Sequence, residues 1–356
     1  MTDVTTLQPG FRFLLEAAHR APSADNTQPW RLQVTGDRLA LRYDDARGHA
    51  ALTGPERHIT LLSMGAVVEN LVQAAAAAGI ALEPVESDSA SKLATYFDVR
   101  LLTPQMAVPD ALTSHPIFQR HTNRHPYRAD PLPADLLGAL GTLHEGGARV
   151  VAVTDRAKIR DLAAGVRVAS EARFKTRELH DWLMGCLRSS PAEVARGDGL
   201  DVRTLHLPPG GGLLLRSLAD WRRMSAFNRI GGYRMLAGIE AGLLGKGPAL
   251  LAVAGPQGRT DVLNAGKVME RAWLLLTERG IAAHPYYVLP DQLQRLARGD
   301  ALPEFSAKIA EVAGWGRETL CLGSDETLHM LLRVGYPKVT PVRSLRLPLE
   351  RVLEVG

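Results

Sequence analysis

Two spacings of hydrophobic residues recur along the chain, and each spacing predicts one kind of element. Alternation of apolar and polar residues indicates strands, and apolar residues three and four positions apart indicate helices. Strands are predicted over residues 32–34, 39–43, 96–102, 150–153, 249–254 and 327–334. Helices are predicted over residues 11–20, 59–78 and 135–143, and between the strand at 150–153 and residue 177. Gly36 and Asp37 mark a hairpin turn, and Gly79 is a good stop for the second helix.

Two stretches of helical pattern resemble each other. The first reads Gly65-Ala-Val-Val-Glu69 and is followed by Gly79-Ile80, and the second reads Gly266-Lys-Val-Met-Glu270 and is followed by Gly280-Ile281. The spacing between the paired glycines is the same, and a predicted strand lies before and after each helix. This agreement predicts a diverged tandem repeat. We expect the first repeat over residues 1–108 and the second over 109–356, with an irregular insertion at about 180–235.

Composition narrows the class of protein. A chain of 356 residues with 46% hydrophobic and 22% charged residues is typical of a soluble globular protein. The net charge of +4 comes without a basic run, so no nucleic-acid partner is expected. Cys186 and Cys321 are too far apart in sequence to indicate a metal site or a disulfide framework. The apolar stretch 64–82 is interrupted by polar residues, so we expect a buried helix, no membrane partner and a cytoplasmic location.

A polar loop follows the first helix. It reads Pro22-Ser-Ala-Asp-Asn26-Thr-Gln28-Pro-Trp30 and presents a hydroxyl at Ser23 and two amides. An amide both donates and accepts hydrogen bonds, so it can pair with the edge of a heterocycle. The same pattern also describes a polar turn with Trp30 as a core anchor, and the residues alone leave both interpretations open.

A second polar segment lies between the repeats. It contains Arg120, Thr122, Arg124 and Tyr127. Two guanidinium groups with a hydroxyl between them suit a phosphate monoester, because guanidinium binds oxygen atoms bidentately. A solvated charge run that precedes a helix is the alternative.

Both segments resemble motifs of the nitroreductase family of FMN-dependent oxidoreductases. The loop resembles the family's flavin-contact motif Pro-Ser-x-x-Asn-x-Gln-Pro-Trp. The second segment resembles its Arg-x-Ser-x-Arg phosphate clamp, with Thr122 in place of serine and one extra residue before the aromatic Tyr127. The resemblance implies an α+β nitroreductase-like fold in which FMN lies between two subunits. Ser23, Asn26 and Gln28 would contact the flavin, and Arg120, Thr122 and Arg124 would bind its phosphate.

The order of the two motifs refines the resemblance. The loop here comes before the clamp, and each repeat holds only one of them, as in the Acg-like branch, where two nitroreductase repeats are fused. The resemblance thus implies a fused pseudodimer with one composite FMN site, a lid insertion, and a monomeric or homodimeric assembly. The expected function is two-electron transfer between NAD(P)H or an organic donor and a small-molecule acceptor. The alternative is a flavin-sequestering protein whose lid blocks NAD(P)H.

Two further candidates lie late in the chain. The closing segment resembles the family's basic end, which implies phosphate contact from Arg346 and, as the weaker match, Arg343; a solvated tail is the alternative. His284 is a candidate proton donor, although a lone histidine is more often structural. No residue pattern identifies a catalytic nucleophile.

Overall fold

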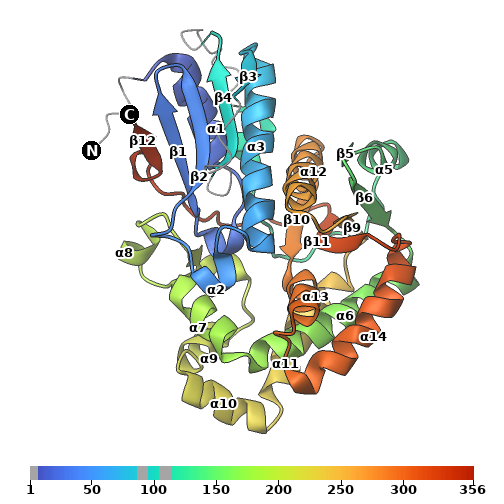
Figure 1. Ribbon diagram of the computed structural model, residues 1–356. Helices are drawn as coiled ribbons and strands as arrows, with labels where there is room; N and C mark the ends of the chain where they lie inside the picture. The colour runs from blue at the N-terminus through green and yellow to red at the C-terminus, as the bar shows by residue number, and fades with distance from the viewer. Residues whose placement is uncertain (1–6, 86–94, 104–113) are drawn as a thin grey trace.

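The computed structural model describes residues 7–85, 95–103 and 114–356, and its fold is α+β (Figure 1). Two five-stranded sheets flank a central pair of long helices, α3 and α12, and a group of mostly helical segments lies below them. The predicted repeat boundary at residue 108 lies outside the described residues.

The elements follow one another in three groups. The first group is α1 Pro9–His19, the 3-10 turn η2 Ala24–Asn26, β1 Trp30–Thr35, β2 Arg38–Tyr43, α2 Ala50–Thr53, α3 His58–Ala78, β3 Leu82–Pro84 and β4 Thr95–Leu101. The second is α4 Pro116–Gln119, α5 Ala134–Gly141, β5 His144–Glu145, β6 Ala148–Val153, α6 Arg156–Lys175, α7 Arg177–Cys186, β7 Leu187–Arg188, α8 Pro191–Val194, β8 Leu200–Asp201, η4 Val202–Leu205, α9 Gly211–Ser217, α10 Trp221–Arg229 and α11 Gly232–Leu244. The third is β9 Ala249–Gly255, α12 Arg259–Glu278, β10 Ala282–Tyr286, α13 Val288–Arg298, α14 Pro303–Leu320, β11 Thr327–Gly335, η5 Leu349–Arg351 and β12 Leu353–Val355.

The two sheets place corresponding strands in the same order, although β12 pairs with β1 in parallel and β5 pairs with β6 antiparallel. The first sheet has the order β12-β1-β2-β4-β3, and the second, read in the same sense, has the order β5-β6-β9-β11-β10. In each sheet the strand before the long helix lies at the centre, and the strand directly after that helix lies at one edge. The two predicted helices of the repeat therefore occupy the same place relative to their own sheets.

Helices α3 and α12 touch through their backbones. A Cβ atom on Gly65 would lie 2.0 Å from the carbonyl oxygen of Leu263, and one on Gly266 would lie 2.2 Å from that of Leu62. The two contacts are equivalent, because each glycine faces the carbonyl three residues before the other glycine. The glycines that mark the repeat in the sequence are therefore the residues that allow the two helices to cross closely.

The C-terminal segment returns from the second sheet to the first. Strand β12 pairs in parallel with β1, with Leu353 beside Leu32. The buried Trp30 donates to Nδ1 of His19, and the other ring nitrogen of His19 lies 2.8 Å from the carbonyl oxygen of Leu347. Trp30 is fully buried, as the core-anchor interpretation of the loop expects.

The strands and long helices predicted from periodicity are confirmed, and Gly79 adopts the left-handed conformation that ends α3. The prediction of an irregular segment at about 180–235 is wrong, because this part is largely helical. Its helices are short and are separated by glycine-containing turns, so no single one shows a long period. By length and composition α3 could cross a membrane, but 78% of its most apolar window is buried inside the protein.

Replacing Gly266 by alanine tests the helix crossing. The added methyl group would meet a backbone carbonyl that cannot rotate away, so the helices must separate, and such overpacking costs about 1–3 kcal/mol. We expect a lower urea midpoint for Gly266→Ala. The matched control is Gly238→Ala in α11, where a Cβ atom meets nothing within 4 Å and alanine favours the helix. Equal stability of the two variants would contradict the close crossing.

Candidate functional site

The loop at residues 22–30 is tightly wound. Asp25, Asn26 and Gln28 all have positive φ, at 45°, 59° and 53°. Such backbone costs about 1 kcal/mol or more for each residue that is not glycine, and it persists only where surrounding contacts hold it. One such contact is the hydroxyl of Ser23, which accepts from the backbone N–H of Gln28 at 3.0 Å.

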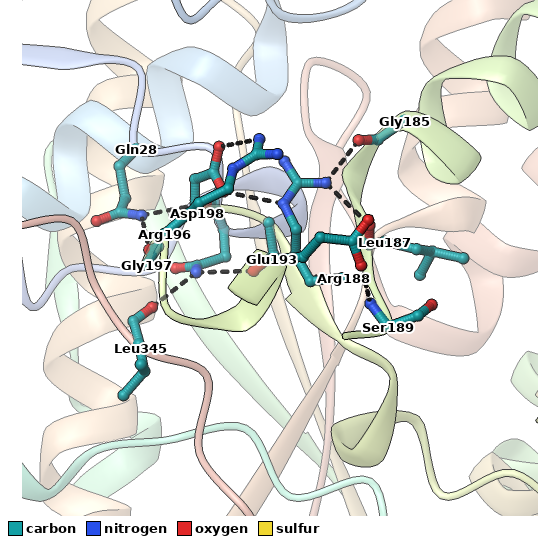
Figure 2. A network of polar contacts seen from close by, with 12 residues as sticks. Gln28, Gly185, Leu187, Arg188, Ser189, Glu193, Arg196, Gly197, Asp198 and Leu345 are labelled. Atoms are coloured by element: carbon teal, nitrogen blue, oxygen red, sulfur yellow. Dashed lines mark hydrogen bonds and ion pairs between the residues drawn. The ribbon is translucent and has the colours of Figure 1, made fainter. Parts of the chain in front are cut away.

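Gln28 is fully buried and uses its whole amide inside the protein; Figure 2 shows its side chain beside Gly197. Its Nε2 donates to the carbonyl oxygens of Asn26 at 2.9 Å and Gly197 at 3.0 Å. Its Oε1 accepts from the backbone N–H of Leu347 at 3.0 Å. Gln28 therefore fastens the loop to the segment after α7 and to the C-terminal segment, and it does not line the cavity described below.

Asn26 is also buried, but it reaches the cavity wall. Its Nδ2 donates to the carbonyl oxygens of Gly199 and Leu345, at 2.8 and 2.9 Å. Its Oδ1 accepts from Nη1 of Arg346 at 2.5 Å. Asn26 thereby orients an arginine that the sequence assigned to the same site.

A cavity of about 800 Å³ lies between the loop, α12 and the helices α7 to α11. Six of the seven residues predicted to bind the cofactor line it, and Gln28 is the exception. The six are Ser23, Asn26, Arg120, Thr122, Arg124 and Arg346. The fold thus brings both sequence motifs and the closing segment, far apart in the chain, to one cavity.

Arg120 is held at one end of this cavity. Its side chain is buried, with Nε 2.8 Å from Oε1 of Glu270 and the guanidinium carbon 4.6 Å from the centre of the Trp273 ring. It also donates to the backbone carbonyl of Arg20. Glu270 and Trp273 both belong to α12, so the central helix positions this arginine.

Four arginines gather here, and we call Arg20, Arg120, Arg343 and Arg346 the cationic end of the cavity. Burial, followed by the charges of Arg120 and Arg20, lowers the pKa of Arg346 to about 9. Burial raises the pKa of Glu270 to about 7, although Arg120 and Arg346 oppose that rise. Four guanidinium groups line this end, and the buried Glu270 interacts with two of them, Arg120 and Arg346, so this end favours an anion.

Arg124 has different partners from Arg120. Its Nη1 lies 3.5 Å from the hydroxyl of Thr204. Burial lowers its pKa, and the nearby Asp25 opposes the shift. The two arginines of the predicted clamp therefore line one cavity but do not share one partner, and Arg124 lies toward the helices that cover the site.

A buried arginine positions the clamp segment. Nη2 of Arg333, in β11, donates to the carbonyl oxygen of His125 at 2.8 Å, and its guanidinium carbon lies 4.1 Å from the centre of the Tyr127 ring. Thr122 forms a parallel bridge to Ala283 in β10. The clamp thus runs beside the edge strand of the second sheet, which aims its side chains at the cavity.

His284 lines the cavity too. Burial, and then Arg124 and Arg333, hold the pKa of His284 well below its ordinary value, so the ring is neutral. Its Nδ1 has no hydrogen-bond partner among the described residues. A neutral ring can donate or accept one bond to a ligand, and a role as proton donor stays a prediction.

We call residues 177–244 the lid; they contain the predicted insertion at about 180–235, and α7, α9, α10 and α11 contribute side chains to the cavity lining. The lid is tied to the loop by Trp182, whose indole Nε1 donates to Oδ2 of Asp25 at 2.7 Å. Sequence reasoning identified the segment but missed Trp182, Glu270 and Trp273 as site residues. For Glu270 the signal was available, because it closes the repeated glycine-to-glutamate motif.

Comparison with known proteins gives distant matches. No model of a protein family matches the chain. An uncharacterized protein of Mycobacterium tuberculosis is 28% identical over 353 residues, which cover 95% of this chain and 47% of the relative. The chain therefore spans about half the length of the curated relative that it matches.

Two solved nitroreductases align with about two thirds of the chain. One is an FMN-dependent nitroreductase of Mycobacterium smegmatis in complex with NADPH, at 19% identity and a TM-score of 0.39, over 66% of this chain and 94% of that one. The other is a nitroreductase of Desulfitobacterium hafniense with bound FMN, at 11% identity and a TM-score of 0.37, over 65% and 91%. These values assign no activity to the chain.

Replacing Gln28 by alanine tests whether its side chain holds the surrounding segments together or contacts the cofactor. Gln28→Ala leaves two backbone groups, the carbonyl of Gly197 and the N–H of Leu347, without their partner, at about 1–3 kcal/mol each before relaxation. We expect a large fall in the melting temperature that is the same with and without added FMN. Gln33→Ala in β1, which is half-buried, is the control and should change stability far less. Unchanged apoprotein stability, with loss of the stabilisation by FMN, would instead make Gln28 a cofactor contact.

Proposed function

We propose that this chain is an FMN-binding oxidoreductase of the nitroreductase type with one composite flavin site. One observation carries the proposal. The loop and the clamp, which the sequence resemblance assigns to opposite sides of one flavin, line the same cavity. A cavity of about 800 Å³ is also within the usual range of 300–1,000 Å³ for ligand sites.

The cationic end fits the phosphate. Four guanidinium groups line this end, and burial, followed by repulsion from Arg120 and Arg20, lowers the pKa of Arg346. A phosphate carries nearly two negative charges at neutral pH and would relieve that repulsion through charge-assisted hydrogen bonds. Arg120 and Arg346 would supply the buried contacts, and Arg20 and Arg343 the exposed ones.

The remaining predicted residues fit the ring and its ribityl chain. Ser23 and Asn26 lie on the loop side, and Arg124, Thr122 and His284 lie on the other. In this assignment Arg124 is a cation near the heterocycle instead of a phosphate ligand. Bound FMN would supply two-electron chemistry between NAD(P)H or an organic donor and a small-molecule acceptor.

The protein's own contribution is position and exclusion of water. Asn26 holds Arg346 at the cavity wall, and Glu270 with Trp273 holds Arg120. The contact between Trp182 and Asp25 keeps the lid against the loop. Enclosure strengthens electrostatic contacts inside the cavity, because fewer water molecules screen them.

We further propose that the two sheets with their long helices are diverged copies, as in the Acg-like branch, with a boundary near residue 108. The matching strand orders and the equivalent glycine contacts support this duplication. The pseudosymmetric counterpart of Glu270 is Glu69, whose Oε1 lies 2.7 Å from Nε of Arg271. Arg271 also pairs with Glu145 at 3.1 Å, so carboxylates outnumber guanidinium groups among these three residues. We therefore expect one FMN per chain.

Flavin sequestration is the second candidate. The observation in its favour is that the lid is fastened to the loop at several points, through Trp182, Gly197 and Gly199. A cover held in this way can deny NAD(P)H access to a flavin beneath it.

Anaerobic mixing of flavin-loaded protein with NADH or NADPH separates these functions. Rapid bleaching of the flavin absorbance is expected if the oxidoreductase takes electrons from NAD(P)H. If dithionite bleaches the flavin but NADH and NADPH do not, the remaining functions are an oxidoreductase with an organic donor and a flavin-sequestering protein. Failure of the purified protein to bind FMN at all would refute both candidates.

Replacing single arginines by alanine tests which of them contact the phosphate of FMN. Arg343→Ala removes a charged contact at the cationic end, and because such a contact is worth about 1.5–3 kcal/mol, FMN affinity should fall at least tenfold. Riboflavin lacks the phosphate, so its affinity should not change. Arg124→Ala should weaken both ligands if Arg124 faces the ring. Fluorescence titration of each ligand measures these affinities.

The control for these titrations is Arg128→Ala. Arg128 follows the clamp, is exposed and does not line the cavity. If Arg343→Ala binds FMN as tightly as this control, the phosphate lies elsewhere. If Arg124→Ala weakens the binding of FMN but not of riboflavin, Arg124 contacts the phosphate, as the sequence predicted.

A further inference from the structure

The cavity has two chemically different halves. The cationic end lies where the loop, the clamp and the C-terminal segment meet. The opposite half, which we call the lid half, is lined by α7, α9 and α11. Aliphatic side chains dominate this lining, and they include Leu183, Leu214, Leu218, Leu236, Ile239 and Leu243.

Charged groups in the lid half are paired with each other. Arg173 lies 2.8 Å from Glu240, and Asp291 lies 3.0 Å from Arg295. Each pair is close to neutral, and the described lining residues that α7, α9 and α11 contribute include no arginine or lysine. Arg124, whose Nη1 lies 3.5 Å from the hydroxyl of Thr204, belongs to the clamp and not to these helices. Burying a charged ligand group here would therefore lack compensation.

The lining also distinguishes between apolar ligands. Aromatic ligands gain most from rings that stack against them. The side chains that α9 and α11 contribute to the cavity are aliphatic apart from Glu240. The two rings that α7 contributes already have polar partners, because Nε2 of His180 lies 3.1 Å from the carbonyl oxygen of Ala219 and Trp182 donates to Asp25. Branched aliphatic side chains instead provide a close-packed surface for a flexible chain.

We propose that the lid half binds an uncharged molecule with an aliphatic chain, next to the flavin. Only the role of this molecule as the second substrate rests on the proposed function. The subsite itself requires no flavin. Ile239 and Leu207 line the cavity and are also solvent-exposed, so the entrance is apolar as well. An aliphatic ligand thus meets matching surface from the rim to the interior.

Two neighbouring positions of α11 form a matched test. Ile239 and Met235 are 48% and 46% exposed, and only Ile239 lines the cavity. Both should accept aspartate without unfolding, and circular dichroism checks this. The probe is 1-decanol, whose binding to the purified full chain is measured by displacement of fluorescent N-phenyl-1-naphthylamine. We expect Ile239→Asp to weaken 1-decanol binding at least tenfold and Met235→Asp to leave it unchanged.

A second pair on α9 repeats the test deeper in the lid. Leu214 lines the cavity and its neighbour Leu213 is 68% exposed outside it, so Leu214→Asp should lose 1-decanol binding and Leu213→Asp should retain it. The aromatic alcohol 2-naphthalenemethanol should displace the reporter from unaltered protein at concentrations at least tenfold higher than 1-decanol. Equal effects within both variant pairs, or preference for the aromatic alcohol, would overturn the proposal.

Titration of FMN keeps the two proposals apart. Neither α9 nor α11 contributes a residue to the cationic end, so FMN affinity should be the same in all four variants. If unaltered protein binds 1-decanol but no FMN, the proposed function fails and the aliphatic subsite stands. If FMN binds and 1-decanol does not, the subsite fails alone.

Discussion

The close crossing of α3 and α12 is the constraint on which the rest of the structure depends. Gly65 and Gly266 each remove a side chain where the other helix's carbonyl approaches. The crossing sets the distance between the two sheets, because each helix packs against its own sheet. It also sets the site, since α12 carries Glu270 and Trp273, which hold Arg120. On α3, Asn70 donates to the carbonyl oxygen of Ala17 and so anchors α1, the helix that leads into the loop.

The arrangement of charged side chains in the cavity destabilises the folded protein. Burial and the charges of neighbouring arginines lower the pKa of Arg120 and Arg346, and the buried Glu270 opposes these shifts. Proteins keep such arrangements where a ligand supplies the missing charge, because binding to the folded state then adds stability. The Asn26 and Gln28 contacts hold the surrounding segments together while that repulsion persists.

A structural feature could be predicted from the sequence where the residues that cause it are neighbours in the chain. Strands, long helices and the stop at Gly79 follow from periodicity and from backbone preferences of single residues, and they were predicted correctly. The loop and clamp could be located because their residue types are unusual together. Gln28 could not be interpreted from its neighbours, since two of its three partners are Gly197 and Leu347. The lid helices escaped notice because each is too short to establish a period.

Strand β12 has a consequence for how the site comes into existence in a cell. It completes the first sheet beside β1, yet the ribosome makes it long after β1 has emerged. The segment that carries Arg343 and Arg346 lies between β11 and β12, and the pairing of β12 with β1 fixes its far end. A chain that has been synthesised only as far as β11 has the loop and the clamp without the arginines that complete the cationic end. The complete anion site therefore becomes available only after this late-synthesised segment has been added.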